Sequence, residues 1–78
     1  MIIYTATFCT KCKIPSILTS NFCKNNNITL SKICFTNPQE FEPYNIKKVP
    51  TLDCSITNNR IVGSENITLH IQKLHKTN

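Results

Sequence analysis

Residues 4–13 read Tyr-Thr-Ala-Thr-Phe-Cys-Thr-Lys-Cys-Lys, and in this segment two residues separate Cys9 from Cys12. Residues 1–6 are rich in Ile, Tyr and Thr and alternate loosely between apolar and polar side chains, which predicts a strand. Residues 11–25 have apolar side chains at helical spacing. The apolar face of this expected helix comprises Ile14, Ile17, Leu18 and Phe22. The cysteine pair is therefore expected where a strand ends and a helix begins.

Further along the chain, apolar runs alternate with turns that contain Asn or Pro. The runs predict a strand at residues 28–35, a short helix that begins at Asn37 and Pro38, strands at 51–56 and 60–63, and a last helix capped by Ser64. A strand–helix–strand start implies a parallel pair, and the later hairpin adds antiparallel strands. The expected fold is α/β, one domain over residues 1–78 with a mixed four-stranded sheet (βαβαββα) flanked by three helices.

The spacing of the cysteines suits redox chemistry. Two intervening residues let the first turn of a helix bring the sulfur atoms within disulfide distance. The free N–H groups at the helix start and the nearby Lys11 and Lys13 favour a thiolate on Cys9. In the expected mechanism, Cys9 attacks a substrate disulfide, and Cys12 then attacks the sulfur of Cys9 and releases the reduced substrate.

A zinc site is the main alternative for a pair of cysteines at this spacing, and it usually needs a second pair of ligands. His70 and His75 are five residues apart, which places them on different faces of a helix, so no metal ligand is assigned.

The other cysteines are assigned no catalytic role. Cys34 and Cys54 lie in strands and are expected in the core. Cys23 lies opposite the apolar face of its helix, so it is expected to be partly exposed. It is either an incidental surface cysteine or a regulatory thiol open to glutathionylation.

Val49 and Pro50 precede the third expected strand. A proline at the start of a strand is ordinary, and X–Pro bonds are cis in only about 5–6% of cases. In combination with the cysteine pair, however, the sequence predicts a cis bond that faces the cysteines. Such a bond would leave the backbone of Val49 free to pair with an extended substrate.

At this point the chain resembles the glutaredoxin family of the thioredoxin-like superfamily, over nearly its whole length. The resemblance is carried by residues 4–13 (YTATFCTKCK), 45–52 (NIKKVPTL) and 61–67 (IVGSENI) and by the order of elements. It implies a thioredoxin-like fold, with Cys9 as nucleophile and Cys12 as resolving cysteine. Two departures are Thr10-Lys11, where the family usually has Pro-Tyr between the cysteines, and Glu65 in place of the usual Asp.

The resemblance also implies a substrate site. Val49, next to a cis Pro50, would bind the cysteinyl part of glutathione, and a segment like Gly63-Ser64-Glu65 would hold its γ-glutamyl carboxylate. Ser64 as an ordinary helix cap is the alternative. The substrate-binding residues expected on these grounds are Lys11, Val49, Pro50, Ser64 and Glu65.

The expected function is electron transport by a disulfide reductase, which reduces protein disulfides or glutathione mixed disulfides with glutathione as reductant and no bound cofactor. One alternative is a thioredoxin-like redoxin recharged by a flavin reductase, for example as donor to ribonucleotide reductase. Another is a module that binds a metal or a cluster.

Charge and hydropathy limit the partners. The net charge of +5 is scattered, which disfavours nucleic acid as a partner, and no apolar run approaches the roughly 18 residues of a membrane span. The start of the chain lacks the pattern of a secretory signal. We therefore expect a cytoplasmic monomer.

Overall fold

The computed structural model describes residues 1–76. Within them, the strands form one four-stranded sheet in the order β2-β1-β3-β4. The strands are β1 (Ile2–Ala6), β2 (Ser31–Phe35), β3 (Thr51–Cys54) and β4 (Asn59–Val62). β1 and β2 are parallel, whereas β3 is antiparallel to both β1 and β4. The mixed sheet and the final hairpin predicted from the sequence are therefore confirmed.

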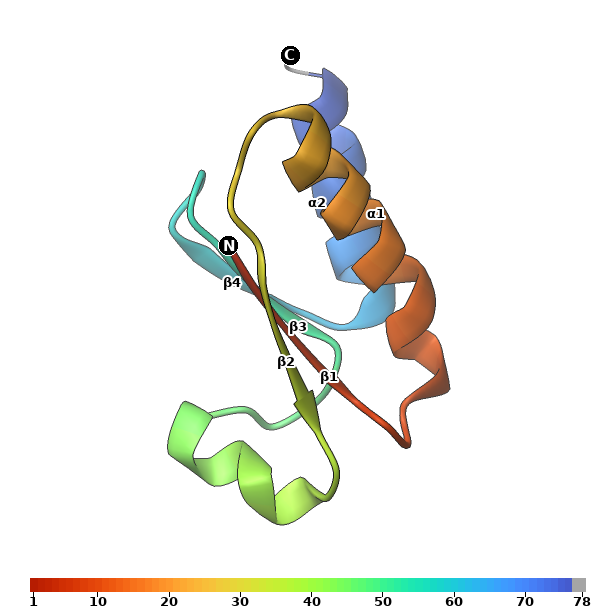
Figure 1. Cartoon of the computed structure of the whole chain (residues 1–78), viewed down its shortest axis with the longest axis vertical. Coiled ribbons are helices and arrows are strands. Elements are labelled where there is room, and N and C mark those ends of the chain that lie inside the picture. The colour runs from red at the N-terminus through yellow and green to blue at the C-terminus, as the bar shows by residue number, and fades with distance from the viewer. Residues whose placement is uncertain (77–78) are drawn as a thin grey trace.

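The helices follow the predicted order as well. They are η1 (Thr10–Cys12), α1 (Lys13–Asn25), η2 (Pro38–Tyr44) and α2 (Ser64–Lys76), of which η1 and η2 are 3-10 helices. α1 and α2 lie together on one side of the sheet, and η2 lies at the lower end of the molecule (Figure 1). No helix within residues 1–76 is long and apolar enough to cross a membrane.

The start of η2 shows why a helix forms at this point. The side chain of Asn37 accepts a hydrogen bond from the backbone N–H of Gln39 at 2.9 Å, and Glu40 reaches back to accept from the N–H of Asn37 at 3.0 Å. Pro38 at the first helical position has no N–H that would need a partner. This reciprocal arrangement is a capping box, and it begins the helix at the residues that the sequence indicated.

Alternation along β1 divides the core into two parts. Ile3 belongs to the cluster that includes residues of both long helices, and Tyr4 belongs to the cluster on the other face of the sheet. The first cluster comprises Ile3, Phe22, Cys23, Leu52, Cys54, Ile67 and Ile71. The second comprises Tyr4, Ala6, Phe35 and Ile46, with Phe41 of η2 and Val49 packed against it. The second cluster therefore supports the segment that carries Val49.

The predicted apolar face of α1 is wrong in part, and so is the prediction for Cys23. Ile14 is 65% exposed and Ile17 is 48% exposed, whereas Cys23 is only 1% exposed. The buried side chains of α1 are Pro15, Thr19, Phe22 and Cys23. This face has helical spacing, but its proline, threonine and cysteine are less apolar than isoleucine. Hydropathy therefore wrongly favoured Ile14 and Ile17 as buried residues. Cys23 is thus not the partly exposed thiol that glutathionylation would need.

The prediction that Cys34 and Cys54 lie in the core is confirmed for one of them and wrong for the other. Cys54 is buried in the core, as predicted, but Cys34 is exposed. Cys34 lies on β2, an edge strand with a neighbouring strand on one side only. A strand pattern alone does not distinguish an edge strand from a central one, which explains the error.

Candidate redox site

Cys9 and Cys12 form a disulfide, with their Cα atoms 5.6 Å apart. After β1 ends, the backbone N–H of Cys9 donates to the carbonyl of Ala6 at 3.1 Å. Cys9 is the extended residue that precedes η1, and Cys12 ends η1 and leads directly into α1. The pair therefore lies at the junction of a strand and a continuous helical run, where the sequence placed it.

The two cysteines differ in exposure. Cys9 is half-buried, whereas Cys12 is only 4% exposed. A molecule that approaches the disulfide from solvent therefore meets Cys9 first. Thr10 and Lys11 between them are both exposed.

The peptide bond between Val49 and Pro50 is cis, as predicted. The carbonyl of Pro50 accepts a hydrogen bond from the N–H of Gly63 at 2.9 Å. Among the residues that the structure describes, no backbone hydrogen bond joins Val49 to another residue. The Val49 backbone is thus available to a ligand, while its neighbour is held by the end of the β3–β4 hairpin.

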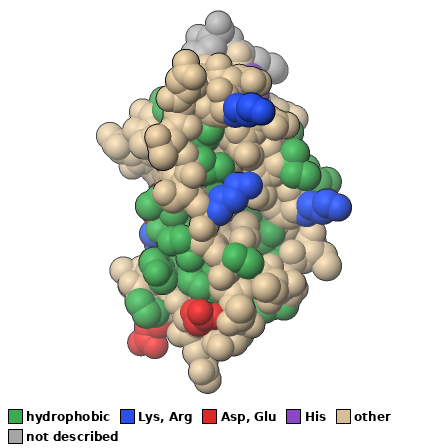
Figure 2. Space-filling view, in the orientation of Figure 1, with side chains coloured by type: hydrophobic (Ala, Val, Ile, Leu, Met, Phe, Trp, Pro, Cys, Tyr) green, Lys and Arg blue, Asp and Glu red, His purple; other side chains and the backbone are tan. Residues whose placement is uncertain are grey.

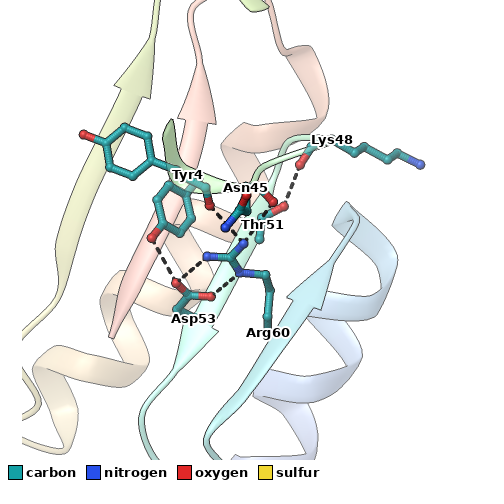
Figure 3. Close-up of polar contacts among 7 residues, drawn as sticks. Tyr4, Asn45, Lys48, Thr51, Asp53 and Arg60 are labelled. Carbon is teal, nitrogen blue, oxygen red and sulfur yellow. Dashed lines mark hydrogen bonds and ion pairs between the residues drawn. The ribbon is translucent and has the colours of Figure 1, made fainter. Parts of the chain in front are cut away.

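The segment that leads to this bond is anchored by Arg60, which is not among the site residues predicted from the sequence. Nη1 of Arg60 donates to the carbonyls of Tyr44 and Asn45, each at 3.1 Å. Near the other end of the segment, the hydroxyl of Thr51 donates to the carbonyl of Lys48 at 2.5 Å. Figure 3 shows both anchors and shows the Lys48 side chain pointing away from the Arg60 cluster.

Asp53 and Tyr4 complete the cluster around Arg60. The Arg60 side chain pairs with both carboxylate oxygens of Asp53, and the Tyr4 hydroxyl donates to the same carboxylate at 2.9 Å. The hydrogen bonds from Arg60 lower the pKa of Asp53, and burial, followed by the nearby carboxylate, raises the pKa of Tyr4. A signal was present in the sequence, because Asp53 and Arg60 are opposite charges on facing positions of the hairpin.

A cavity of about 410 Å³ brings the expected substrate-binding residues together from separate parts of the chain. Lys11 comes from η1, Val49 and Pro50 from the segment before β3, and Ser64 and Glu65 from the first turn of α2. The remaining lining residues are Lys48, Val62, Gly63 and Asn66. All five residues selected from the sequence thus face one space.

A second cavity, of about 370 Å³, lies beside the disulfide. It is lined by Phe8, Cys9, Thr10, Lys11, Phe41, Lys48 and Val49. Lys11, Lys48 and Val49 line both cavities, so the two spaces adjoin along these residues. We call the first the helix-end cavity and the second the cysteine cavity.

The start of α2 corrects the prediction that Ser64 caps this helix. The N–H of Ile67 donates to the carbonyl of Gly63 at 3.0 Å, so Gly63 occupies the cap position and Ser64 is the first helical residue. Gly63 has φ +99°, a backbone conformation that residues with a side chain rarely adopt. This explains why a glycine occupies the turn. The first turn of α2 presents backbone N–H groups without partners in the helix at the helix-end cavity.

His70 and His75, the two histidines considered as metal ligands, lie in separate surroundings. Within residues 1–76, no group of three or more His, Cys, Asp or Glu side chains is placed to hold a metal ion. His70 lies 3.5 Å from the hydroxyl of Thr57, and His75 packs edge-on against Phe22 with ring centroids 5.0 Å apart, so each has a separate environment. On the face shown in Figure 2, the Lys and Arg side chains lie apart from one another.

Comparison of the chain with models of protein families, with curated proteins and with solved structures gives no match. The function must therefore be inferred from the residues of the chain. They form a small α/β domain with a mixed four-stranded sheet, in which a Cys9–Cys12 disulfide at a strand-to-helix junction is compatible with a redox-active pair.

Proposed function

We propose that this chain is a small dithiol oxidoreductase with a thioredoxin-like fold, similar to the glutaredoxins, that reduces protein disulfides or glutathione mixed disulfides. The observation that carries the proposal is the position of the Cys9–Cys12 disulfide before α1, with Cys9 lining a cavity that Val49 also lines. A structural disulfide would need neither an adjoining cavity nor an unpaired backbone beside it.

The proposed reaction transfers two electrons from the enzyme to the substrate. In the reduced enzyme, the Cys9 thiolate attacks one sulfur of the substrate disulfide, and the other sulfur leaves as a thiolate that takes up a proton. Cys12 loses its proton and attacks the sulfur of Cys9, which releases the second substrate thiol and forms the Cys9–Cys12 disulfide. The half-buried Cys9 and the buried Cys12 suit these two roles in this order.

Two features support a thiolate on Cys9. The helical run that follows it presents free N–H groups and the positive end of its dipole. Lys11 and Lys48 line the same cavity as Cys9, and among its lining residues there is no acidic side chain. Both effects favour the charged form of the thiol.

Glutathione is the proposed reductant, on the strength of the helix-end cavity. Its cysteinyl backbone would pair with Val49, and a carboxylate would bind at the first turn of α2, where Ser64 and Glu65 present N–H groups. Lys11 and Lys48 supply positive charge at the same cavity, against the single negative charge of Glu65.

The test uses three serine variants and a glutathionylated peptide as substrate. We expect Cys9→Ser to lose all activity and Cys12→Ser to accumulate a mixed disulfide with glutathione on Cys9, detected by mass spectrometry of the intact protein. Cys34→Ser, at an exposed thiol outside the site, is the matched control and keeps full activity. Full activity in Cys9→Ser would falsify the proposal.

The equilibrium with a glutathione redox buffer distinguishes two reductants. A potential of about −200 to −230 mV is typical of glutaredoxins, and one of about −270 mV is typical of thioredoxin. The second value would favour the alternative, a thioredoxin-like redoxin recharged by a flavin reductase.

A further inference from the structure

We infer that the cysteine cavity selects peptide substrates in which the disulfide cysteine has a bulky apolar neighbour and an acidic residue close by. The inference rests on the proposed function and deepens it, because it names the class of disulfide that the site prefers. It rests on Phe8 and Phe41, which neither the cysteine chemistry nor the helix-end cavity uses, and on Lys11 and Lys48, which line both cavities.

The apolar wall of this cavity is formed by two aromatic rings from distant parts of the chain. Phe8, next to Cys9, is 51% exposed, and its ring centroid lies 6.2 Å from that of Phe41 on η2. Phe41 in turn packs on the buried Phe35 with centroids 5.0 Å apart. The wall is therefore supported by the core, although Phe8 itself remains open to a ligand.

The charged side chains that line the cysteine cavity are all positive. Lys11 and Lys48 are the charged residues among its lining, and both are exposed. The nearby acids are on η2, where the carboxylate of Glu40 already accepts hydrogen bonds from Thr36 and Asn37 and Glu42 is exposed. An acidic residue of the substrate would thus meet two lysines at the edge of the cavity.

Glutathione alone does not match this arrangement. Its cysteine has a γ-glutamyl group and a glycine as neighbours, which carry carboxylates but no apolar side chain. It would meet the charge of Lys11 and Lys48 and leave the wall of Phe8 and Phe41 uncovered. A peptide that extends along Val49 and places an apolar side chain beside its cysteine would cover both.

The chemical step is the two-electron exchange described above. Cys9 and Cys12 become a disulfide, and the S–S bond of the peptide breaks. One of the two peptide thiols takes up the proton that Cys12 loses, and the other takes up a proton from solvent, because Cys9 reacts as a thiolate. No further oxidant or reductant enters a single turnover. The preference can therefore be measured with prereduced protein, whichever thiol or reductase recharges it.

The test compares three peptide disulfides of one length in single turnovers: Leu beside the cysteine with Glu nearby, Ala with Glu, and Leu with Lys. We expect the second-order rate constant for the Leu–Glu peptide to be about tenfold above that for the Ala–Glu peptide, since one apolar side chain in a pocket discriminates by about this factor. It should also exceed that for the Leu–Lys peptide, because Lys11 and Lys48 attract Glu and repel Lys. Equal rates for the three peptides overturn the inference.

Variants of Phe8 and Lys48 test which side chains produce the preference. In Phe8→Ala the ratio between the Leu–Glu and Ala–Glu peptides falls to about one, and in Lys48→Gln the preference for Glu over Lys becomes weaker. Ile56→Ala, at an exposed apolar residue outside both cavities with a similar exposure of 49%, keeps the wild-type ratios. A ratio unchanged in Phe8→Ala contradicts the inference.

Reduction of glutathione disulfide by the wild-type protein distinguishes a failure of this inference from a failure of the proposed function. If the wild-type protein reduces glutathione disulfide but does not distinguish the peptides, the inference is wrong and the proposed function stands. If it reduces neither glutathione disulfide nor any peptide, the proposed function itself fails.

Discussion

The guanidinium of Arg60 binds the carboxylate of Asp53 through two hydrogen bonds, Nε to Oδ1 at 2.6 Å and Nη2 to Oδ2 at 3.0 Å. Its remaining nitrogen donates to the carbonyls of Tyr44 and Asn45. One side chain thereby joins the β3–β4 hairpin to the end of η2, where the segment that carries Val49 begins. Arg60 therefore contributes first to the stability of the fold and, through the end of η2, to the position of the segment that carries Val49.

Replacement of Arg60 is expected to destabilise the fold. An exposed ion pair contributes about 0–1 kcal/mol, and hydrogen bonds from a charged donor contribute more, so Arg60→Met should lower the free energy of unfolding by about 1–2 kcal/mol. Urea denaturation measures this change. Asp53→Ala is the comparison, since it keeps the bonds of Arg60 to the two carbonyls and should cost less. Equal stability of Arg60→Met and wild type would show that the cluster contributes nothing.

The pH dependence of stability follows from two carboxylates. Hydrogen bonds from Arg60 lower the pKa of Asp53, and hydrogen bonds from Thr36 and then Asn37 lower the pKa of Glu40. A carboxyl whose pKa is lower in the folded state stabilises the fold above its unfolded pKa, and this contribution is lost as the pH falls through the folded pKa. The free energy of unfolding should therefore decrease below about pH 4.

Asp53→Asn and Glu40→Gln each test part of this decrease. Each variant removes one titrating group, so its unfolding free energy should fall less steeply with acid than that of the wild type. Thermal unfolding followed by circular dichroism over a pH series gives the slopes. A slope as steep in both variants as in the wild type would assign the acid sensitivity to other groups.

The free cysteines should differ in reactivity. Cys34 is exposed, whereas Cys23 and Cys54 are 1% and 3% exposed, and burial raises the pKa of the Cys23 thiol. With the Cys9–Cys12 disulfide intact, an alkylating reagent should therefore label Cys34 within the native protein and the other two only after denaturation. Peptide mapping by mass spectrometry identifies the labelled sites. Rapid native labelling of Cys23 would mean that α1 opens readily.

Thr19 offers a stabilising substitution. Its side chain is fully buried, and its hydroxyl has no hydrogen-bond partner among the described residues. Because valine has a similar shape and no polar atom to desolvate, Thr19→Val should raise the free energy of unfolding by about 1 kcal/mol, or the melting temperature by about 4–8 °C. Ser20→Ala, on the same helix and half-buried, controls for the change in helix propensity. A lower melting temperature in Thr19→Val would contradict the assignment.

Much of the fold was predictable because its signals are local. The strand before Cys9, the capping residues around Asn37 and the hairpin turn each depend on neighbouring residues. The errors arose where burial depends on distant segments. Hydropathy favoured Ile17 over Cys23 for the buried face of α1, because the pattern contains no information about which side meets α2 and the sheet.

The local sequence was sufficient to bring Cys9 and Cys12 within disulfide distance. Two residues between Cys9 and Cys12 at a helix start bring the sulfurs together through local backbone geometry, without help from the rest of the chain. The surroundings of the pair, in contrast, depend on contacts between distant segments. Phe8 meets Phe41, and Arg60 holds the end of η2, because the sheet pairs strands that lie far apart in the sequence, and such contacts have no local signal.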